Sequence, residues 1–522
     1  MTRASDMAAG SLPGETALRV SEGIVNAHTE WVVASQTAGP SAVGSSALNF
    51  VEQSYGVNVR NFGAKGDYRT VSDGVVNAGS AALTSATGSF SSADKNKSIT
   101  VFGAGAGGTN MITTISNVTS PTTAVLAATA ATGVSGAIVA WGTDDTAALV
   151  AAATSAAALG GAVRVRAGQY LVASNVTLSV PIEFEPGGVI VVGNGVTSFV
   201  VDGEIRASDL QQIISGSANI QPVTSPSGGP TLTVTTPFAL AAAHPIQFKM
   251  TASGMLGTAA FQYRFSWDGG ITWNDWVGPD LQEPQVPVPN LSFITTATPS
   301  YAWTIPGLGI NVRFPAADPA NPYVQDATYT WTSGGIVSLG STSRISVAWF
   351  GAKGDRTTDD TSAVQAAMSY FSDVAGFRGG TVYFPAGRYL LSYTLYFVGF
   401  VGNGVKFVGP FAGTQWSGGA VLQWAGIAGA TMLDAYGLNQ CSFENLVFDG
   451  SLLAGCGTWF HTNQQNRGSD TNGVYISKCI WARVQGGLYA ACAMGDSPGA
   501  FSITNYSSRT ANLESSAQPP SG

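Results

Sequence analysis

The sequence has few charged residues for its length. Lys, Arg, Asp and Glu make up 10% of the 522 residues, against roughly 25% in an average soluble protein. The 31 acidic residues outnumber the 23 basic ones, which gives a formal net charge of −8. A nucleic-acid-binding protein would carry a basic patch or a high isoelectric point. We therefore expect no nucleic-acid partner.

Long apolar runs are also absent. No stretch of 18 or more apolar residues escapes interruption by Gly, Ser, Thr or Asn, and a membrane-spanning helix needs such a stretch. The first twenty residues lack the apolar core of a signal peptide. We therefore expect no membrane partner, synthesis in the cytoplasm, and release outside a cell only by lysis or on a particle.

Cysteine and histidine are scarce. The four cysteines (Cys441, Cys456, Cys479 and Cys492) form no CxxC pair, and the three histidines are scattered. A Cys/His metal site needs such residues in a cluster. We expect no metal and no cofactor. Buried free thiols are the simpler interpretation of the cysteines, and one disulfide is the alternative.

The residues that are present favour β structure. The chain has 65 Gly and also 12 Trp, 16 Tyr and 24 Phe, which are enough aromatics to build a core. At ~100–200 residues per domain, the length predicts three or four units. The composition therefore indicates a charge-poor, β-rich protein of several units.

The strongest pattern is an internal repeat. FGAKGD occurs at 62–67 and at 350–355, and TDDT follows at 143–146 and at 358–361. Each TDDT precedes a segment with helical periodicity, a Gly pair, and two short strands joined by a turn. We expect the paired aspartates to cap these helices rather than to perform chemistry.

The spacing within the two copies differs. Phe350 and Thr358 are 8 residues apart, whereas Phe62 and Thr143 are 81 apart, so the first copy carries 73 extra residues at about 70–141. Short strand-like runs and Gly/Ser/Thr turns fill this insertion, which predicts a small inserted β domain.

Between the copies, residues 207–345 are rich in Pro and in strand-like runs. Within them, 266–273 (SWDGGITW) has the pattern of an Asp box. It is either part of a sugar-binding module or a plain hairpin in which Asp268 bonds to its own turn. After 400, Phe443 and Ile476 lie 33 residues apart, about one coil of stacked parallel strands plus a loop.

The motif FGAKGD…TDDT…GG-T-V-YFPAG-Y resembles the N-terminal signature of pectate-lyase-like proteins, a group that includes polygalacturonase-related proteins and bacteriophage tailspikes. The resemblance covers 349–392, and also 57–67 with 142–172. It implies an all-β fold, namely a right-handed single-stranded parallel β-helix with N-terminal capping helices and inserted small β domains.

Two copies of the motif and a polar N-terminal segment look most like a phage tailspike or tail-fibre protein. The resemblance implies five regions: a virion-attachment segment at 1–56, a first β-helix cap repeat at 57–206, an intermediate β-rich domain at 207–345, a second β-helix at 346–506, and a flexible tail at 507–522.

The same resemblance implies a homotrimer on the virion tail. Its N-terminus would contact phage tail or baseplate proteins, and its β-helix would bind, and in an enzymatic form depolymerise, host cell-surface polysaccharide. Two alternatives stay open. One is a structural or adaptor spike without activity, and the other is a secreted polysaccharide lyase or hydrolase.

No catalytic residue transfers from the related enzymes, because Asn-Thr-Asp, Gly-His-Gly and Arg-Ile-Lys motifs are absent. Glycoside hydrolysis needs two carboxyl groups ~5–5.5 Å or ~6.5–9.5 Å apart. Glu444, Asp449 and Asp470 are the candidates that we choose from the second copy. An extended strand would hold Glu444 and Asp449 about 16 Å apart, which is too far unless the strand turns at Asp449-Gly450.

The loop 451–470 supplies candidate substrate-binding residues. Trp459, His461 and Arg467 could stack on and hydrogen-bond to a sugar, and the alternative is a solvated loop. For a lyase, which needs a base beside a cation that neutralises a uronate, only Lys478 and Arg483 lie nearby.

Overall fold

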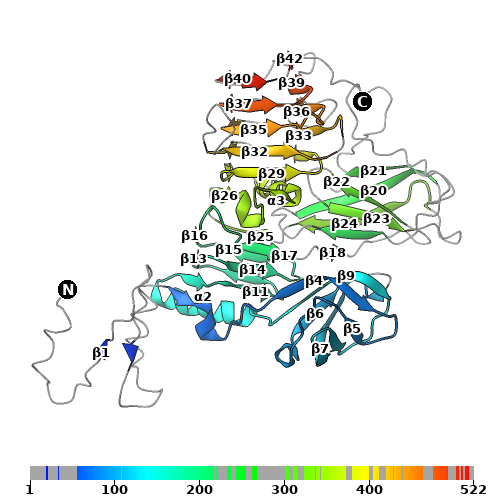
Figure 1. Ribbon diagram of the computed structural model, residues 1–522, viewed down its shortest axis with the longest axis vertical. Coiled ribbons are helices and arrows are strands. Elements are labelled where there is room, and N and C mark those ends of the chain that lie inside the picture. Colours follow the sequence, from blue (N-terminus) through cyan, green and yellow to red (C-terminus); the bar gives the residue numbers. More distant parts are fainter. Residues whose placement is uncertain are drawn as a thin grey trace, which may run out of the picture.

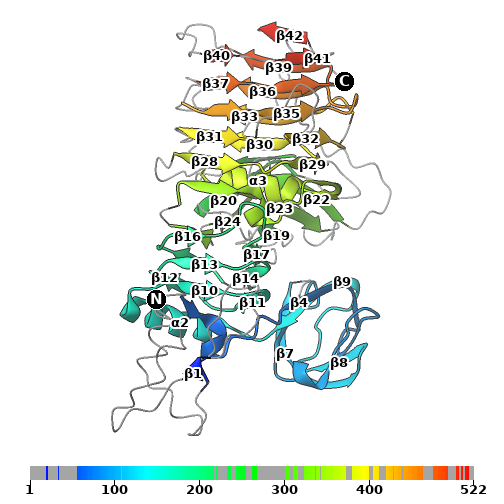
Figure 2. The same cartoon turned by 60° about the vertical axis from the view of Figure 1, so that its left-hand side comes forward.

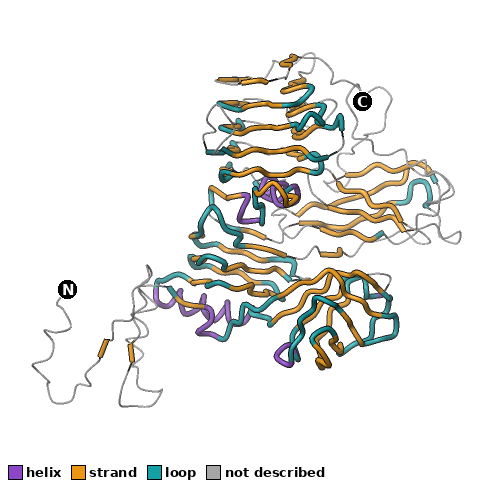
Figure 3. The backbone as a smooth tube through the Cα atoms, viewed as in Figure 1, coloured by secondary structure: helices purple, strands orange, loops and turns teal. Residues whose placement is uncertain are grey.

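The computed structural model describes residues 19–20, 33–34 and 56–515. Within the last range, it leaves out 107–108, 194–195, 217–218, 222–231, 237–242, 254–261, 267–299, 306–309, 316–322, 335–336, 341, 372–378, 399–403, 411–418, 427, 437–439, 462–473, 492–500, 505–506 and 510–511. The described chain is mostly β-strand with few helices, and two stacks of short strands lie one above the other (Figures 1, 2 and 3).

Except for one short strand that precedes it, the first stack follows helix α2 (Thr146–Leu159), and its strands pair in parallel in three sheets. The sheets contain β3 (Val57–Asn58), β10 (Val163–Val165), β13 (Ile182–Phe184) and β16 (Ile205–Arg206); β11 (Gly168–Val172), β14 (Gly188–Val192) and β17 (Ile214–Gly216); and β12 (Val176–Leu178), β15 (Phe199–Val201) and β25 (Val337–Ser338). Alternate residues such as Val163 and Val165 are buried, as period-2 patterning requires.

A closed antiparallel barrel interrupts this stack between the two halves of the first motif (Figure 1). Its strands are β4 (Arg69–Val76), β5 (Ala82–Thr84), β6 (Ser98–Val101), β7 (Met111–Ser120), β8 (Thr123–Leu126) and β9 (Val134–Gly142). It has its own apolar core, in which Phe90 packs on Trp141 with ring centroids 4.8 Å apart. A separate apolar cluster that includes Tyr68, Ala140, Leu171 and Val191 joins the barrel to the stack.

A second insertion lies between β17 and β25. It consists of two antiparallel sheets, one with β18 (Asn219–Gln221), β19 (Thr233–Thr236), β22 (Ser300–Ile305) and β23 (Ile310–Pro315), the other with β20 (Ala243–Ala252), β21 (Gln262–Ser266) and β24 (Thr328–Gly334). Phe248 stacks on Trp331 in its core. Except for Ser266, the Asp-box motif lies outside the described residues.

The second stack begins just before the second motif, and most of its strands follow helix α3 (Thr361–Tyr370). Its three parallel sheets contain β26 (Arg344–Ser346), β28 (Gly380–Tyr383), β31 (Val405–Val408), β34 (Ser442–Glu444), β37 (Val474–Ser477) and β40 (Phe501–Thr504); β27 (Asp355–Asp359), β29 (Gly387–Leu391), β32 (Ala420–Trp424), β35 (Leu446–Asp449), β38 (Ile480–Ala482) and β41 (Ser507–Arg509); and β30 (Leu395–Val398), β33 (Thr431–Tyr436), β36 (Cys456–His461), β39 (Gly486–Ala491) and β42 (Asn512–Ser515).

Successive coils of the second stack place like residues over one another. Phe443 pairs with Ile476 in register, so the 33-residue spacing does correspond to one coil. Phe407 stacks on Phe443 with ring centroids 4.8 Å apart, and Phe448 stacks on Trp481 at 5.9 Å. Such offset aromatic pairs add to the stabilisation from burial.

The C-terminal residues differ from the flexible tail that the sequence suggests. Ser507–Arg509 form β41 beside β38, and Asn512–Ser515 form β42 beside β39. An edge strand presents unpaired backbone groups. The segments 507–509 and 512–515 pair with such groups on β38 and β39, although most of their residues are polar.

The two stacks share one apolar core. Helix α3 lies at their junction, where Val364, Ala367, Met368 and Phe371 are buried, as the helical spacing predicts. The Tyr370 hydroxyl accepts the Leu339 N–H at 2.7 Å. Arg344 of the second stack holds Asp209 of the first with two bonds at 2.7 and 2.8 Å.

The described cysteines are free thiols. Cys441, Cys456 and Cys479 are buried, which confirms the simpler interpretation for these three, and Cys492 lies outside the described residues. Burial raises the pKa of Cys479 to about 12, so this thiol is unreactive at neutral pH. No helix in the described part of the chain is long and apolar enough to cross a membrane.

Candidate functional site

The motif aspartates have a structural role at the starts of the two helices, as their position in the sequence predicts. Asp144 and Asp359 each accept the backbone N–H and the hydroxyl of the Thr two residues later, the first residue of the helix. This bonding satisfies donors that a helix start otherwise leaves unpaired.

The second aspartate of each pair reaches back into the FGAKGD loop. Asp145 accepts the N–H groups of Lys65 and Gly66 at 2.6 and 3.1 Å, and Asp360 accepts those of Lys353 and Gly354 at 2.7 and 3.0 Å. Burial raises the pKa of both carboxyls above the ordinary value, although the loop N–H groups oppose this shift. Both copies thus lock loop and helix together in the same way.

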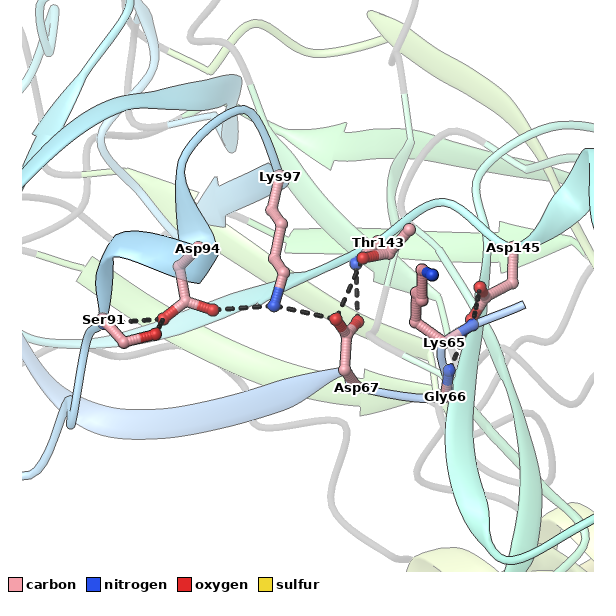
Figure 4. Close-up of polar contacts among 8 residues, drawn as sticks. All are labelled: Lys65, Gly66, Asp67, Ser91, Asp94, Lys97, Thr143 and Asp145. Atoms are coloured by element: carbon pink, nitrogen blue, oxygen red, sulfur yellow. Dashed lines mark hydrogen bonds and ion pairs between the residues drawn. The ribbon is translucent and has the colours of Figure 1, made fainter. Parts of the chain in front are cut away.

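A cluster of ion pairs joins the barrel to the first stack (Figure 4). The Lys97 ammonium lies 2.8 Å from Asp67 and 2.7 Å from Asp94. Asp67 also accepts the N–H and the hydroxyl of Thr143, at 2.8 and 2.9 Å. The chain enters the barrel just after Asp67 and leaves it just before Thr143. The Asp67 carboxylate therefore links the entering and the leaving segment to each other and to Lys97 of the barrel.

This junction is expected to weaken in acid. Burial favours a higher pKa for Asp67 and for Asp94, but the bonds from Lys97 and the neighbouring donors outweigh it, so both pKa values lie below the ordinary 3.8. A carboxyl whose pKa is lower in the folded than in the unfolded state stabilises the fold at pH values above 3.8. This contribution is lost as the pH falls through the folded-state pKa values.

We expect Lys97→Met to lower the free energy of unfolding by about 1–3 kcal/mol at pH 7. The deficit relative to wild type should shrink as the pH falls from 3.8 through the lower folded-state pKa values, where both carboxyls become protonated. Denaturant titrations at pH 7 and pH 3 measure this, with exposed Lys95→Met as the matched control. A deficit that does not change with pH would contradict this role for the cluster.

Glu444 and Asp449, two of the candidate catalytic carboxylates, lie on different sheets. Glu444 ends β34 and accepts the Ser442 hydroxyl at 3.1 Å, whereas Asp449 ends β35. Asn445, with φ 58°, makes the corner between the two strands. The corner that separates the two carboxylates therefore lies directly after Glu444, before the Asp449-Gly450 turn that the sequence suggests.

Asp449 is held by cations. Its side chain has no exposed surface, and it forms ion pairs with Arg388 at 3.3 Å and with Arg483. A general acid must reach the glycosidic oxygen, and a fully covered carboxylate between two guanidinium groups does not. The geometry assigns Asp449 to holding three coils together, since its partners come from β29 and from the turn after β38.

The candidate binding residues Trp459 and His461 fall on β36, and only their backbone positions are described. Across four strand pairs, one register row contains Tyr396, Asp434, Trp459, Tyr489 and Glu514. A second row contains Val398, Tyr436, His461 and Ala491. Along the strands these backbone positions alternate with buried Leu433, Ala435 and Thr458, so by register they belong to the other face of the sheet.

The other predicted site residues lie outside the described residues. These are Arg467 and Asp470. Sequence reasoning missed Arg388, which is 61 residues from Asp449, and Gln423, whose side-chain oxygen accepts from Arg388 at 3.4 Å. Arg388, Gln423 and Asp449 are far apart in the sequence and meet only through the strand register. In that register Gln423 pairs with Leu390 on one side and with Asp449 on the other, and Arg388 is two residues before Leu390.

No metal centre is evident in the described part of the chain, where no three His, Cys, Asp or Glu residues gather as ligands. The described side chains supply isolated carboxylates and guanidinium groups, and the strand register aligns aromatic residues across neighbouring coils. Such groups suit the recognition of sugars, in which rings stack on aromatics and hydroxyls bond to polar side chains.

Comparison with known proteins finds a family match for part of the second stack. Residues 344–471 match the family model described as rhamnogalacturonase A/epimerase, pectate lyase-like. This match confirms the pectate-lyase-like resemblance that the second FGAKGD motif indicates. No curated protein matches the sequence.

Several solved structures show a distant likeness. ORF18 of Geobacillus virus E2 is 18% identical over 33% of this chain and 40% of its own, with a TM-score of 0.22. The GH87 alpha-1,3-glucanase catalytic unit from Streptomyces thermodiastaticus is 15% identical over 56% and 54%, with a TM-score of 0.21. The Gp54 tailspike of Acinetobacter baumannii bacteriophage AP22, solved with capsular saccharide, is 10% identical over 70% and 55%, with a TM-score of 0.15. The chain thus spans between 40% and 55% of these three proteins' lengths.

Proposed function

We propose that this protein is a phage tailspike or tail-fibre component that binds host cell-surface polysaccharide. The observation that carries the proposal is the register of the sheet β30-β33-β36-β39-β42, which aligns aromatic and acidic residues in rows across neighbouring coils. A flat face of this composition suits a long, uncharged or weakly charged sugar chain better than a small ligand. The pectate-lyase-like match of residues 344–471 supports the same class of ligand.

We extend the proposal to the architecture of the whole chain. The two stacks would each be a right-handed parallel β-helix, at 57–206 and 346–506, with the inserted β-rich domain of 207–345 between them. Residues 1–56 would attach to tail or baseplate proteins, and the spike would be a homotrimer on the virion tail. In this account Trp459, His461 and Arg467 contact the sugar chain.

Depolymerisation is a second candidate function, which the family match favours because its model is named for a rhamnogalacturonase. Glu444 and Asp470 are then the candidate catalytic carboxylates, and Asp449 is a structural one. A hydrolase would need a partner carboxyl within ~10 Å of Glu444.

We expect purified protein to bind the polysaccharide of its host and, if enzymatic, to release new reducing ends. The measurement follows binding, reducing ends and the ultraviolet absorbance of unsaturated uronate in one digest. Reducing ends alone indicate a hydrolase, and absorbance indicates a lyase and excludes the carboxylate candidates. Binding with neither signal indicates a receptor-binding spike. The absence of both binding and cleavage would contradict the proposed function and favour a purely structural tail component.

A further inference from the structure

Helix α2 carries no charged side chain, although one of its faces is exposed in the described part of the chain. Its sequence, TAALVAAATSAAAL, contains no Asp, Glu, Lys, Arg or His. The exposed face, which we name the α2 outer face, consists of Ala147, Val150, Ala151, Thr154 and Ala158. The Thr154 hydroxyl, the one polar group among these side chains, donates to the Val150 carbonyl at 2.9 Å. A helix that is apolar all round is normally buried, so this composition indicates that something covers the face.

The equivalent helix of the second copy is covered. Counted from the helix starts at Thr146 and Thr361, Val150 corresponds to Gln365 and Ala151 to Ala366. Val150 is 42% exposed, whereas Gln365 is 4% and Ala366 is 9% exposed. Helix α3 lies at the junction of the two stacks, and α2 lies at the base of the first (Figure 1).

The chain just before the second motif forms part of the cover of α3. Leu339 is buried, and its N–H donates to the hydroxyl of Tyr370 on α3 at 2.7 Å. Val337, two residues earlier, is buried in the same apolar core and lies on β25, which pairs with β15 of the first stack. Residues 337–339 therefore contact both the helix and the preceding coil.

The two copies correspond residue by residue in front of their motifs. The short 3-10 helices η2 (Val59–Phe62) and η5 (Val347–Phe350) are 288 residues apart, as are the two FGAKGD motifs. Each begins at a side chain that accepts the N–H two residues later, and each ends at a left-handed Gly. The same spacing aligns 335–340 (GIVSLG) with 47–52 (ALNFVE), and Leu339 with Val51.

Residues 47–52 lie outside the described residues, but the chain that follows them starts beside α2. It resumes at Gly56, four residues after Glu52, and continues into β3 and η2, which both contact α2. Four extended residues span ~13 Å, and a helix of 14 residues is ~21 Å long. The segment 47–52 is therefore within reach of the α2 outer face, and Leu48, Phe50 and Val51 give it apolar side chains.

We propose that residues 47–52 of this chain pack on the α2 outer face and close the base of the first stack, as residues 337–339 do on α3. Burial of apolar side chains on both partners stabilises such a contact. The inference goes beyond the proposed function and does not depend on the ligand. It places the point where the N-terminal segment leaves the stacks at their base, opposite the end formed by β40, β41 and β42.

The first test measures how fast a maleimide labels Val150→Cys in the full chain. Cys492→Ser is included, because the other three cysteines are buried. We expect labelling at least about tenfold slower than that of Asp202→Cys, an exposed position of the first stack. Adding Val51→Asp should restore fast labelling, and adding Val43→Asp, which lies outside 47–52, should not. Equal labelling of Val150→Cys and Asp202→Cys would overturn the inference.

A second test identifies the segment that covers the helix. Ser155 corresponds to Tyr370, the partner of Leu339, so Val51→Cys and Ser155→Cys are treated together with a short bismaleimide. We expect a cross-link within one chain, located by mass spectrometry. A cross-link between two chains, or protection of Val150→Cys that weakens on dilution, would overturn the inference and assign the face to a second copy. Protection that survives Val51→Asp would equally overturn it, because another segment would then cover the helix.

Discussion

Replacing Asp360 with Ala is expected to lower the free energy of unfolding by about 2–6 kcal/mol. The Asp360 side chain is almost fully buried, and its two oxygens are the acceptors for the N–H groups of Lys353 and Gly354. Without the carboxylate both donors lose their partner, and each such loss costs about 1–3 kcal/mol. Denaturant-induced unfolding, followed by tryptophan fluorescence, measures the difference.

The control for this prediction is Asp202→Ala at an exposed position, which should change stability by no more than about 0.5 kcal/mol. Asp145→Ala in the first copy should resemble Asp360→Ala, because it removes the equivalent pair of bonds. If Asp360→Ala were as stable as wild type, the aspartate would not be what holds the FGAKGD loop.

Asp449→Ala is the second variant with a large expected effect. It leaves Arg388 and Arg483 facing each other without their shared carboxylate, and breaking a buried ion pair in this way costs about 3–5 kcal/mol. Removing Arg483 as well should restore part of the loss, since the repulsion between the two cations disappears. A double-mutant cycle of Asp449→Ala and Arg483→Ala quantifies the coupling.

The same position separates a structural role from catalysis. If Asp449 only holds the coils, cleavage or binding by Asp449→Asn should follow its folded fraction. A fully folded Asp449→Asn variant that has lost cleavage but keeps binding would show instead that this carboxylate is catalytic, and the structural assignment would be wrong.

The local elements of the fold were predictable because their causes are local. Helical spacing placed Val364, Ala367, Met368 and Phe371 on one buried face, and the paired aspartates marked the helix starts. The bonds from Asp145 to Lys65 and Gly66 were not predictable, because they join residues about 80 positions apart across an inserted barrel. Only the folded chain shows that the two motif halves meet.

The candidate site was predictable only in part, for the same physical reason. Glu444 and Asp449 are close in sequence, yet a single left-handed residue, Asn445, sends them to different sheets. Arg388 became a partner of Asp449 through strand register, which hydrophobic patterning does not encode over 61 residues. Likewise, polar Ser507–Arg509 became a strand because an open sheet edge was available to pair with it.

The central claim is that the outer face of β36 and its neighbours binds polysaccharide, and Trp459→Ala tests it most directly. Loss of an aromatic stacking partner should weaken binding of the host polysaccharide at least about tenfold, with an unchanged melting temperature. Tyr475→Ala is the matched control, an exposed aromatic on β37 of another sheet. We expect a binding titration to separate the two variants, with Tyr475→Ala equal to wild type. Undiminished binding by Trp459→Ala would contradict the account.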